Sequence, residues 1–447
     1  MSPTPQRRPY VSRTSSFASG ADSPVQVLEE CLAAIDQREA AVAAFTVIEA
    51  QAARSAAEAS TKRWRANAPL SAIDGMPVGV KDMIDTADMV TGMGSPLFDG
   101  YRPRFDAASV QGLREAGAVI LGKTVTTEFA SSEPRGTRNP WDVTRTPGGS
   151  SSGSAAAVGC GMLCGGLGTQ VVGSILRPAG FCGAYGFKPS VGGINRGGSL
   201  DYLSQSVTGT IAASLADAWA MARAIADRVG GDPGYPGLTG PLTVPPPRRP
   251  TRLALLRTAG WPILTAPARA SLEAALDWLR AAGATVLTPE DCDALATVEA
   301  ATAEAHPITM GINAWEWRWP LDSFVARDAS VLSPSTRERH ARSQAMTQAE
   351  YVALLARRDA ARAAYAALAK QVDAVISVTA PGAAPVGLET TGNPVFVVPG
   401  SMLGAPGVSL PVLDDSGLPL GLQVLGFPQS DEILIAAAGW IEDTLRG

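Results

Sequence analysis

Hydrophobic and polar positions along the chain predict helices and strands that follow one another. In residues 23–66 a capping serine and a proline precede two alanine-rich, helix-like runs, so two helices are expected before the first strand. The segments MPVGVKD and AVILGKT are apolar and β-branched, and the helix-like run DAASVQGLREAG lies between them. Strands that alternate with helices are typical of an α/β sheet whose strands are largely buried.

The rest of the chain repeats this alternation. The prolines of residues 236–250 predict a surface connector, after which a strand, an amphipathic helix and another strand follow. Residues 294–370 are expected to form helices around the aromatic sequence WEWRW, and residues 371–447 to form strands and a closing helix. The polar residues 1–22 predict a mobile tail or an arm laid on the surface.

Composition narrows the classes of partner. The 447 residues are 46% hydrophobic, which allows a large core, and the formal charge of -5 comes from 37 basic and 42 acidic residues without a basic stripe. No nucleic acid is therefore expected as a ligand. No stretch approaches the roughly 20 apolar residues that span a bilayer, and the N-terminus lacks the apolar region of a secretion signal.

Cysteines and histidines limit the chemistry. The five cysteines form an odd set without a C-x-x-C pair or a neighbouring histidine, so we expect no metal, no cofactor and a reduced, cytoplasmic setting. His306 and His340 lie in a charge-rich, helix-like stretch far along the chain from the serine-rich motifs, and a surface or packing role is favoured for both. If this chain performs acyl transfer, another residue must move the proton.

Three motifs point to such chemistry when they are taken together. They are PVGVKD with Lys81, PGGSSSGSAAAVG with Ser150 and GTQVVGSILRPA with Ser174. Taken singly, a lysine at a strand end is usually a solvated charge, GGSSSGS is more often a linker, and GSILRPA fits a tight strand-to-helix turn. Small apolar residues run through the glycine-rich stretch 139–209, however, and a flexible linker would lack them.

In this combination the chain resembles the amidase signature family over nearly its whole length. The resemblance rests on the segments DGMPVGVKDMIDTADMVTGMGS, GAVILGKTVTTEFA, RNPWDVTRTPGGSSSGSAAAVG, GTQVVGSILRPAGFCGAYGFKPS and GLPLGLQVLGFPQSDEILIAAAGWIE. The nucleophile of that family lies 24 residues after the first serine of its GGSS run, and Ser174 lies 24 residues after Ser150. The resemblance implies an α/β fold with a central mixed, mostly parallel sheet of about 10–11 strands covered on both faces by helices.

The resemblance also implies a serine hydrolase with a Ser–cisSer–Lys triad. Neutral Lys81 would take a proton from Ser150 while Ser150 takes one from Ser174, whose oxygen attacks the scissile carbonyl and forms an acyl-enzyme. A lysine acts as a base only where burial disfavours its charged form, and the apolar strand before Lys81 predicts such burial. The oxyanion would be held by the backbone N–H groups of Val171, Val172, Gly173 and Ser174.

The turn before Ser174 departs from the common family sequence GTDTGGSIR. Gln170 replaces an aspartate, Val171 and Val172 replace Thr and Gly, and the arginine falls one place later, at Arg177. The family aspartate and arginine usually support the site through hydrogen bonds. Gln170 is a candidate neutral substitute, whereas the direction in which Arg177 points stays open.

Candidate substrate-binding residues follow from the same resemblance and from apolar positions. They are Met93, Thr126, Thr127, Glu128, Ser151 and Gln170. The segment 126–128 takes the place of a family segment beside the acyl cleft, where Glu128 either lines the pocket or supports it. The alternating Trp315, Trp317 and Trp319 are candidates for an apolar substrate wall, although packing between helices is favoured for them.

Three functions are compatible with these motifs. The first is a free-standing amidase that cleaves a neutral, fairly hydrophobic amide, anilide or carbamate, in the manner of an aryl acylamidase or a urethanase. The second is an amidotransferase component that depends on partner subunits and a tRNA-bound substrate, and the third is a non-catalytic scaffold. The altered turn and the short C-terminal region favour the first over the second, and the intact Lys-Ser-Ser set argues against the third.

The first interpretation implies a single domain over residues 1–447. Its parts are N-terminal helices at 23–66, a catalytic core at 70–235, a helical region at 294–370 that shapes the substrate pocket, and C-terminal strands with a helix at 371–447. The expected partner is a small-molecule amide or carbamate, with no nucleic acid and no membrane span. A homodimer is compatible with the sequence.

Overall fold

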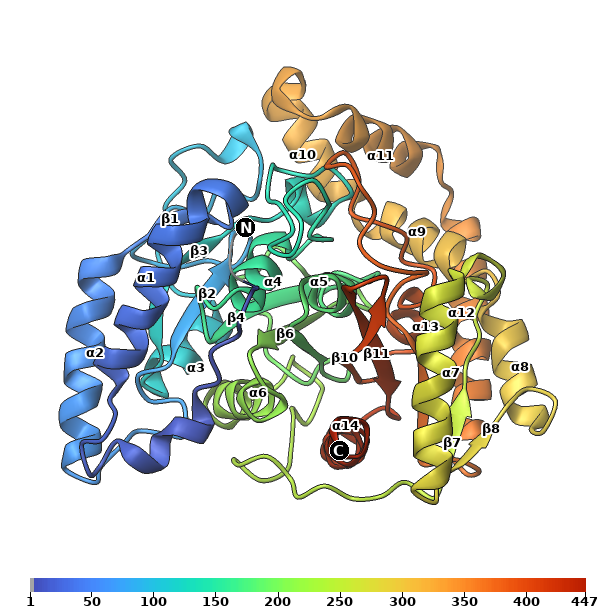
Figure 1. Cartoon of the computed structure of the whole chain (residues 1–447). Coiled ribbons are helices and arrows are strands. Elements are labelled where there is room, and N and C mark those ends of the chain that lie inside the picture. The colour runs from blue at the N-terminus through green and yellow to red at the C-terminus, as the bar shows by residue number, and fades with distance from the viewer. Residues whose placement is uncertain (1–3) are drawn as a thin grey trace.

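One eleven-stranded sheet forms the centre of the computed structural model, which describes residues 4–447 (Figure 1). The strands are β1 (Phe45–Ile48), β2 (Pro77–Lys81), β3 (Val119–Thr124), β4 (Gly165–Gln170), β5 (Tyr185–Lys188), β6 (Val207–Ala212), β7 (Arg252–Leu255), β8 (Thr285–Leu287), β9 (Ala374–Val378), β10 (Gly407–Asp415) and β11 (Leu418–Leu425). Their order across the sheet is β1-β3-β2-β4-β6-β5-β10-β11-β9-β7-β8. Strands β2 to β6 are buried along their whole length.

The sheet is mixed, as expected, but parallel pairs do not predominate. Four neighbouring pairs are parallel, namely β3–β2, β2–β4, β9–β7 and β7–β8, and the other six are antiparallel. The antiparallel pairs fill the middle of the sheet because β5 and β6, and likewise β10 and β11, follow one another in the chain and lie side by side. A parallel pair needs a longer crossover connection, which α3 (Ala108–Glu115) provides for β2–β3 and α7 (Ala266–Ala281) for β7–β8.

Helices cover both faces of the sheet. The α-helices are α1 (Pro24–Val42), α2 (Ala50–Arg65), α3 (Ala108–Glu115), α4 (Ser152–Gly159), α5 (Leu176–Cys182), α6 (Leu215–Val229), α7 (Ala266–Ala281), α8 (Asp293–Thr302), α9 (Ala305–Glu316), α10 (Arg318–Asp328), α11 (Pro334–Ala345), α12 (Gln348–Leu368), α13 (Val398–Met402) and α14 (Asp431–Arg446). One core cluster joins α3, α6 and α14 to the sheet, and another joins α1, α2, α4 and α5 to it. Short 3-10 helices are η1 (Val11–Ser16), η2 (Pro96–Phe98), η3 (Glu128–Ala130), η4 (Trp261–Ile263) and η5 (Ala329–Val331).

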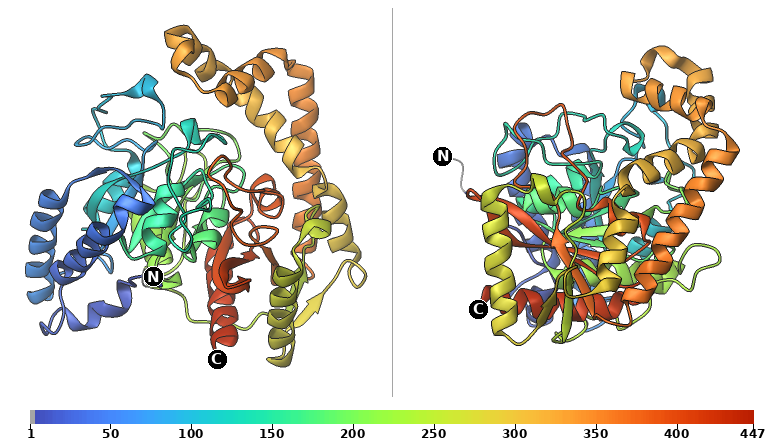
Figure 2. Two further views of the ribbon diagram at one scale, coloured as in Figure 1. Left: turned by 45° about the horizontal axis from the view of Figure 1, so that its top comes forward. Right: turned by 90° about the vertical axis from the view of Figure 1, so that its right-hand side faces the viewer.

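The helices expected between residues 294 and 370 form a wall at one side of the molecule. Figure 2 shows α9 to α12 standing beside the sheet, with α10 and α11 extending beyond its end. Residues of α8, α9 and α12 share an apolar cluster with β7 and β9. A smaller cluster packs Trp317, Leu321 and Phe324 of this wall against Phe98 and Phe129 of the loops around η2 and η3.

The N-terminal part differs from the expectation of two helices before the first strand. The short strand β1 lies between α1 and α2 and pairs with β3, because the β-branched and aromatic sequence FTVI suits a strand even at four residues. Residues 1–22 are expected to form either a mobile tail or an arm laid on the surface, and from residue 4 onward the chain forms a packed arm. Tyr10 and Phe17 are fully buried, and the N–H groups of Tyr10 and Val11 donate to the Asp217 carboxylate.

Within residues 4–447, no helix combines the length and the apolar character that crossing a membrane requires. The five cysteines are all buried and none is in a disulfide.

Candidate active site

Lys81 is the last residue of β2 and is completely buried. Its Nζ lies 2.7 Å from Ser150 Oγ and 2.7 Å from Thr169 Oγ1. Thr169 belongs to β4, the strand beside β2, so the sheet itself brings both side chains together. Burial lowers the pKa of Lys81 to about 7, although the charge of Asp201 acts in the opposite direction. A lysine with this pKa is partly unprotonated at neutral pH and able to accept a proton.

The two candidate serines lie on adjacent turns. Ser150 stands just before α4 and follows a cis peptide bond from Gly149. Ser174 lies between β4 and α5, and its carbonyl oxygen accepts a hydrogen bond of 3.3 Å from the N–H of Ser151. Both serines line one cavity of about 500 Å³. Ser174 retains 8% of its surface exposed, so a small molecule in the cavity can reach it.

Gln170 holds the turn that carries Ser174. Its side-chain oxygen accepts hydrogen bonds from the N–H groups of Ile175 and Leu176 at 2.8 and 3.0 Å, and its Nε2 donates to Ser401. Ser401 in turn donates to the carbonyl of Val172. The amide thus does the work that a carboxylate could do at this position, since the N–H groups it binds need only an acceptor.

The turn leaves a set of backbone donors free. In the described part of the chain, no acceptor binds the N–H groups of the residues expected to hold the oxyanion. Those residues are Val171, Val172, Gly173 and Ser174, and the cavity lining includes three of them, Val171, Val172 and Ser174. Free N–H groups beside a serine hydroxyl are suited to binding a tetrahedral oxyanion, and the role of these four residues stays a prediction.

Arg177 points toward the site. It lies on α5 and its Nη2 donates to the carbonyl of Gly149 at 2.8 Å and to Thr391 Oγ1 at 3.0 Å. The guanidinium therefore supports the peptide group directly before Ser150. The one-place shift of this arginine in the sequence has not removed it from the site.

The cavity has walls that the sequence motifs do not include. The lining residues outside the motifs come from four segments, namely Ala130, Ser131, Ser132 and Glu133 of η3 and the loop after it, His306, Met310 and Asn313 of α9, Ser335, Glu338, Arg339 and Arg342 of α11, and Glu389, Thr390, Thr391, Gly392 and Pro394 of a second loop. The helical residues recur at spacings of three, four and seven, so each set occupies one face of its helix. This spacing can be read from the sequence, but it does not show which part of the molecule the helix face packs against. His306, for which a surface or packing role is expected, is exposed and lines the same cavity as the two serines.

The six candidate substrate-binding residues do not line this cavity. All are buried and most are bound to neighbouring groups, the full set being Met93, Thr126, Thr127, Glu128, Ser151 and Gln170. Glu128, for example, accepts hydrogen bonds from Ser95, from the N–H of Ser333 and from Thr336, and so connects η3 to the start of α11. The Ser151 hydroxyl exchanges hydrogen bonds with the backbone of Thr169. Ser151 and Gln170 thus hold the backbone of β4 and of the turn that carries Ser174.

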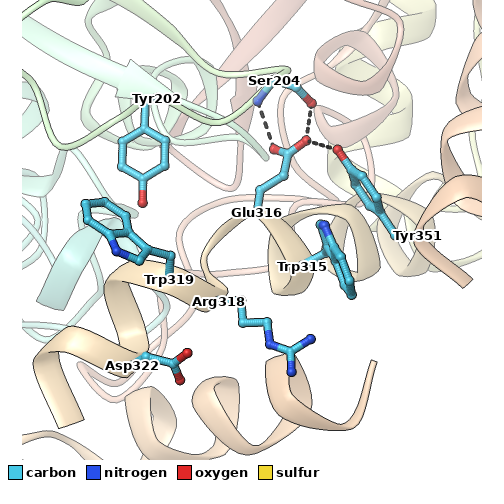
Figure 3. A pocket seen from close by; sticks show the side chains of 8 residues that line it. All are labelled: Tyr202, Ser204, Trp315, Glu316, Arg318, Trp319, Asp322 and Tyr351. Carbon is cyan, nitrogen blue, oxygen red and sulfur yellow. Dashed lines mark hydrogen bonds between the residues drawn. The ribbon is translucent and has the colours of Figure 1, made fainter. Parts of the chain in front are cut away.

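The tryptophans at 315–319 also lie outside the cavity that holds the serines. Trp317 is buried in the cluster around Phe324, which agrees with a packing role. Trp315 and Trp319 line a separate, more open cavity of about 570 Å³ together with Tyr202 and Tyr351 (Figure 3). In that cavity the Glu316 carboxylate accepts hydrogen bonds from the N–H and the hydroxyl of Ser204 and from the Tyr351 hydroxyl.

Comparison with known proteins identifies the class. The sequence matches the amidase family over residues 26–435. A glutamyl-tRNA(Gln) amidotransferase subunit from Anaeromyxobacter dehalogenans (strain 2CP-C) is 31% identical over 468 residues, which cover 96% of this chain and 95% of that protein. A crystal structure of an amidase superposes with a TM-score of 0.84 at 27% identity, over 98% of this chain and 99% of the other. Native peptide amidase from Stenotrophomonas maltophilia gives 0.81 at 26% identity, over 98% and 97%.

The chain therefore belongs to the amidase family, and the resemblance inferred from its motifs is confirmed. It has the fold of the amidase signature enzymes, which hydrolyse carbon–nitrogen bonds.

Proposed function

We propose that the protein is a free-standing amidohydrolase that cleaves an amide-type bond of a small molecule through an acyl-enzyme on Ser174. One observation carries the proposal, namely the 2.7 Å contact between the buried Nζ of Lys81 and Ser150 Oγ beside the cavity that Ser174 lines. Because this lysine is fully buried, it does not serve as a solvated surface charge. It is suited to drawing a proton from a serine relay.

The reaction starts with Lys81 in its neutral form. Lys81 takes the proton of Ser150, Ser150 takes the proton of Ser174, and the Ser174 oxygen bonds to the carbonyl carbon. The free N–H groups at residues 171–174 hold the negative oxygen of the tetrahedral intermediate. The proton returns through Ser150 to the leaving nitrogen as the C–N bond breaks, and a water molecule then releases the acyl group by the same path.

The lining of the cavity suits an amide, an anilide or a carbamate with an apolar part. Val171, Val172, Met310 and Pro394 supply apolar surface, and Asn313 supplies a neutral polar group. A carbamate differs from an amide by one oxygen on the acyl side, so the same relay would split both.

A second candidate is the amidotransferase role that the names of the curated relatives carry. Those relatives are called subunits, and in that role the chain would act with partner proteins and release ammonia from glutamine. Free glutamine therefore belongs in any substrate screen.

The test is turnover by the purified protein of primary amides, p-nitroanilides, aryl carbamates and glutamine. We expect Ser174→Ala to abolish hydrolysis without changing the melting temperature by more than a few degrees. Ser55→Ala, at an exposed position of α2 outside the lining, should keep wild-type activity. Activity of Ser174→Ala within tenfold of wild type would remove Ser174 as the nucleophile, and turnover confined to glutamine would favour the amidotransferase role.

A further inference from the structure

Two guanidinium groups at the cavity have no carboxylate partner. Arg177 is only 4% exposed, its Nη2 binds the neutral oxygens of Gly149 and Thr391, and its Nε and Nη1 have no hydrogen-bond partner in the described part of the chain. Arg339 reaches from α11, stacks over the Trp317 ring at 4.3 Å, and has an Nη1 that is likewise unpartnered. Neither arginine takes part in an ion pair among the described residues.

A guanidinium that is shielded from water and has no anionic partner is energetically unfavourable. Taking a guanidinium out of water costs several kcal/mol, and proteins usually recover this with a carboxylate or a phosphate. Burial lowers the pKa of Arg177 to about 10 and that of Arg339 to about 10, which expresses the same penalty. The interior of the cavity thus lacks an anion.

The surrounding charges do not make up the deficit. Asp201 is the buried carboxylate whose field reaches Arg339, but it also faces Lys81 and Arg196. Burial, and then the charges of Arg177 and Arg342, lower the pKa of His306, so His306 supplies no counter-charge to the arginines.

The acidic residues of the lining stand toward solvent. Glu338 and Glu389 are exposed and Glu133 is half-buried, whereas Arg177 is buried. Glu338 is also paired with Arg342 at 3.3 Å. Among the charged residues of the lining, Arg177 is therefore the buried one, Arg339 is half-buried, and the carboxylates are half-buried or exposed.

We propose that the substrate carries a carboxylate that binds Arg339 inside this cavity while the amide carbonyl lies at Ser174. Arg177, whose free nitrogens are shielded, contributes through its charge and not through contact. The Nη1 of Arg339 is shielded as well, so its Nε and Nη2 make the contact and bind the carboxylate in two hydrogen bonds. The inference rests on the proposed function for the position of the amide, and it narrows the substrate to amides with an anionic group.

The test compares substrates that differ only in this charge. Monoamides of succinic and glutaric acid are measured against their methyl esters with wild type, Arg339→Gln and Arg337→Gln. We expect wild type to prefer the acids, and Arg339→Gln to lower kcat/KM for the acids by about 10- to 100-fold, mainly through KM, while the esters change little. Arg337 lies exposed on the same helix outside the lining, so its variant should behave as wild type.

Binding of glutarate by calorimetry separates this proposal from the catalytic one. Glutarate should bind wild type and Arg337→Gln, and binding should weaken at least tenfold in Arg339→Gln, whether or not any amide is hydrolysed. Equal turnover of acids and esters, or glutarate binding that ignores Arg339, would overturn the anionic subsite and leave the hydrolase intact. Glutarate binding at Arg339 without hydrolysis of any amide would support the subsite and count against the proposed function.

Discussion

Three lysines of this protein are buried, and only Lys81 touches a candidate catalytic group. Lys123 donates to the Ile84 carbonyl and to Thr91, and Lys188 donates to the Pro189 carbonyl. Burial lowers the pKa of Lys188 to about 7, as it does for Lys81. A lowered pKa therefore does not identify the base. The contact with Ser150 does.

The first prediction at the residue scale concerns pH. Lys81 is charged and inactive below its pKa and neutral above it, so kcat/KM for an amide should rise with pH through an ionisation near 7. Lys81→Ala should remove this rise and lower the rate on the order of 10³-fold. A p-nitrophenyl ester of the same acyl group should lose less, because p-nitrophenolate leaves without a proton.

A matched control comes from Lys188, which has a similar pKa but does not line the cavity. Lys188→Gln should keep the rise near pH 7 even if it lowers stability. If Lys81→Ala lowered kcat/KM equally for the amide and the ester, Lys81 would be a structural residue and another group would transfer the proton.

At the scale of elements, Glu128 couples η3 to α11. Its carboxylate accepts from the N–H of Ser333 at 3.1 Å and from Thr336 Oγ1 at 2.5 Å, and it pairs with Arg135 at 2.9 Å. Burial alone would raise the pKa of Glu128, but the hydrogen bonds from Ser333 and Thr336 outweigh it, so the pKa is lowered. The start of the helix that carries Arg339 thus depends on a charge supplied by a distant loop.

Glu128→Gln should destabilise the protein by about 1–3 kcal/mol at neutral pH, because an amide cannot satisfy all of these donors. KM should rise more than kcat falls, since α11 lines the cavity and the Lys81–Ser150 contact is untouched. A group with a lowered pKa stabilises above its ordinary range, so the gap between variant and wild type in urea unfolding should shrink on acidification. Glu58→Gln, at an exposed position, serves as the control. An unchanged KM would show that α11 is held independently of Glu128.

For the whole molecule, the N-terminal arm is a structural part of the fold. Phe17 is fully buried and meets the rings of Tyr10 and Trp64 edge-on at 5.4 Å each. The arm also bridges α6 through Asp217. It lies against the sheet and α1–α2, and none of its residues lines the cavity.

Phe17→Ala should lower the free energy of unfolding by about 3–5 kcal/mol, as expected for deleting a buried ring. The kcat of the remaining folded protein should stay as in wild type. Phe105→Ala removes the same side chain where it is 79% exposed, and its effect should remain within about 0.5 kcal/mol. Equal losses for the two variants would contradict the packed arm.

The sequence by itself determined the features that depend on local pattern. The alternation of apolar runs and helix-like runs predicted the layered α/β sheet, and the spacing of Lys81, Ser150 and Ser174 within recognisable motifs predicted the family. Both patterns are local in sequence, because helix and strand periodicity and turn motifs each involve residues that are close together in the chain. The short strand β1 was missed, since four residues between two helices give too weak a pattern.

Only the tertiary structure decided what surrounds the serines. His306 and Arg339 lie more than a hundred residues beyond Ser174 in the chain, yet the packing of α9 and α11 against the sheet brings them to the same cavity. The six residues expected to bind substrate are buried and are not part of the cavity lining. Periodicity shows which residues share one face of a helix. It does not show what that face packs against or whether a buried charge has a counter-charge, because both depend on contacts between segments that are distant in sequence.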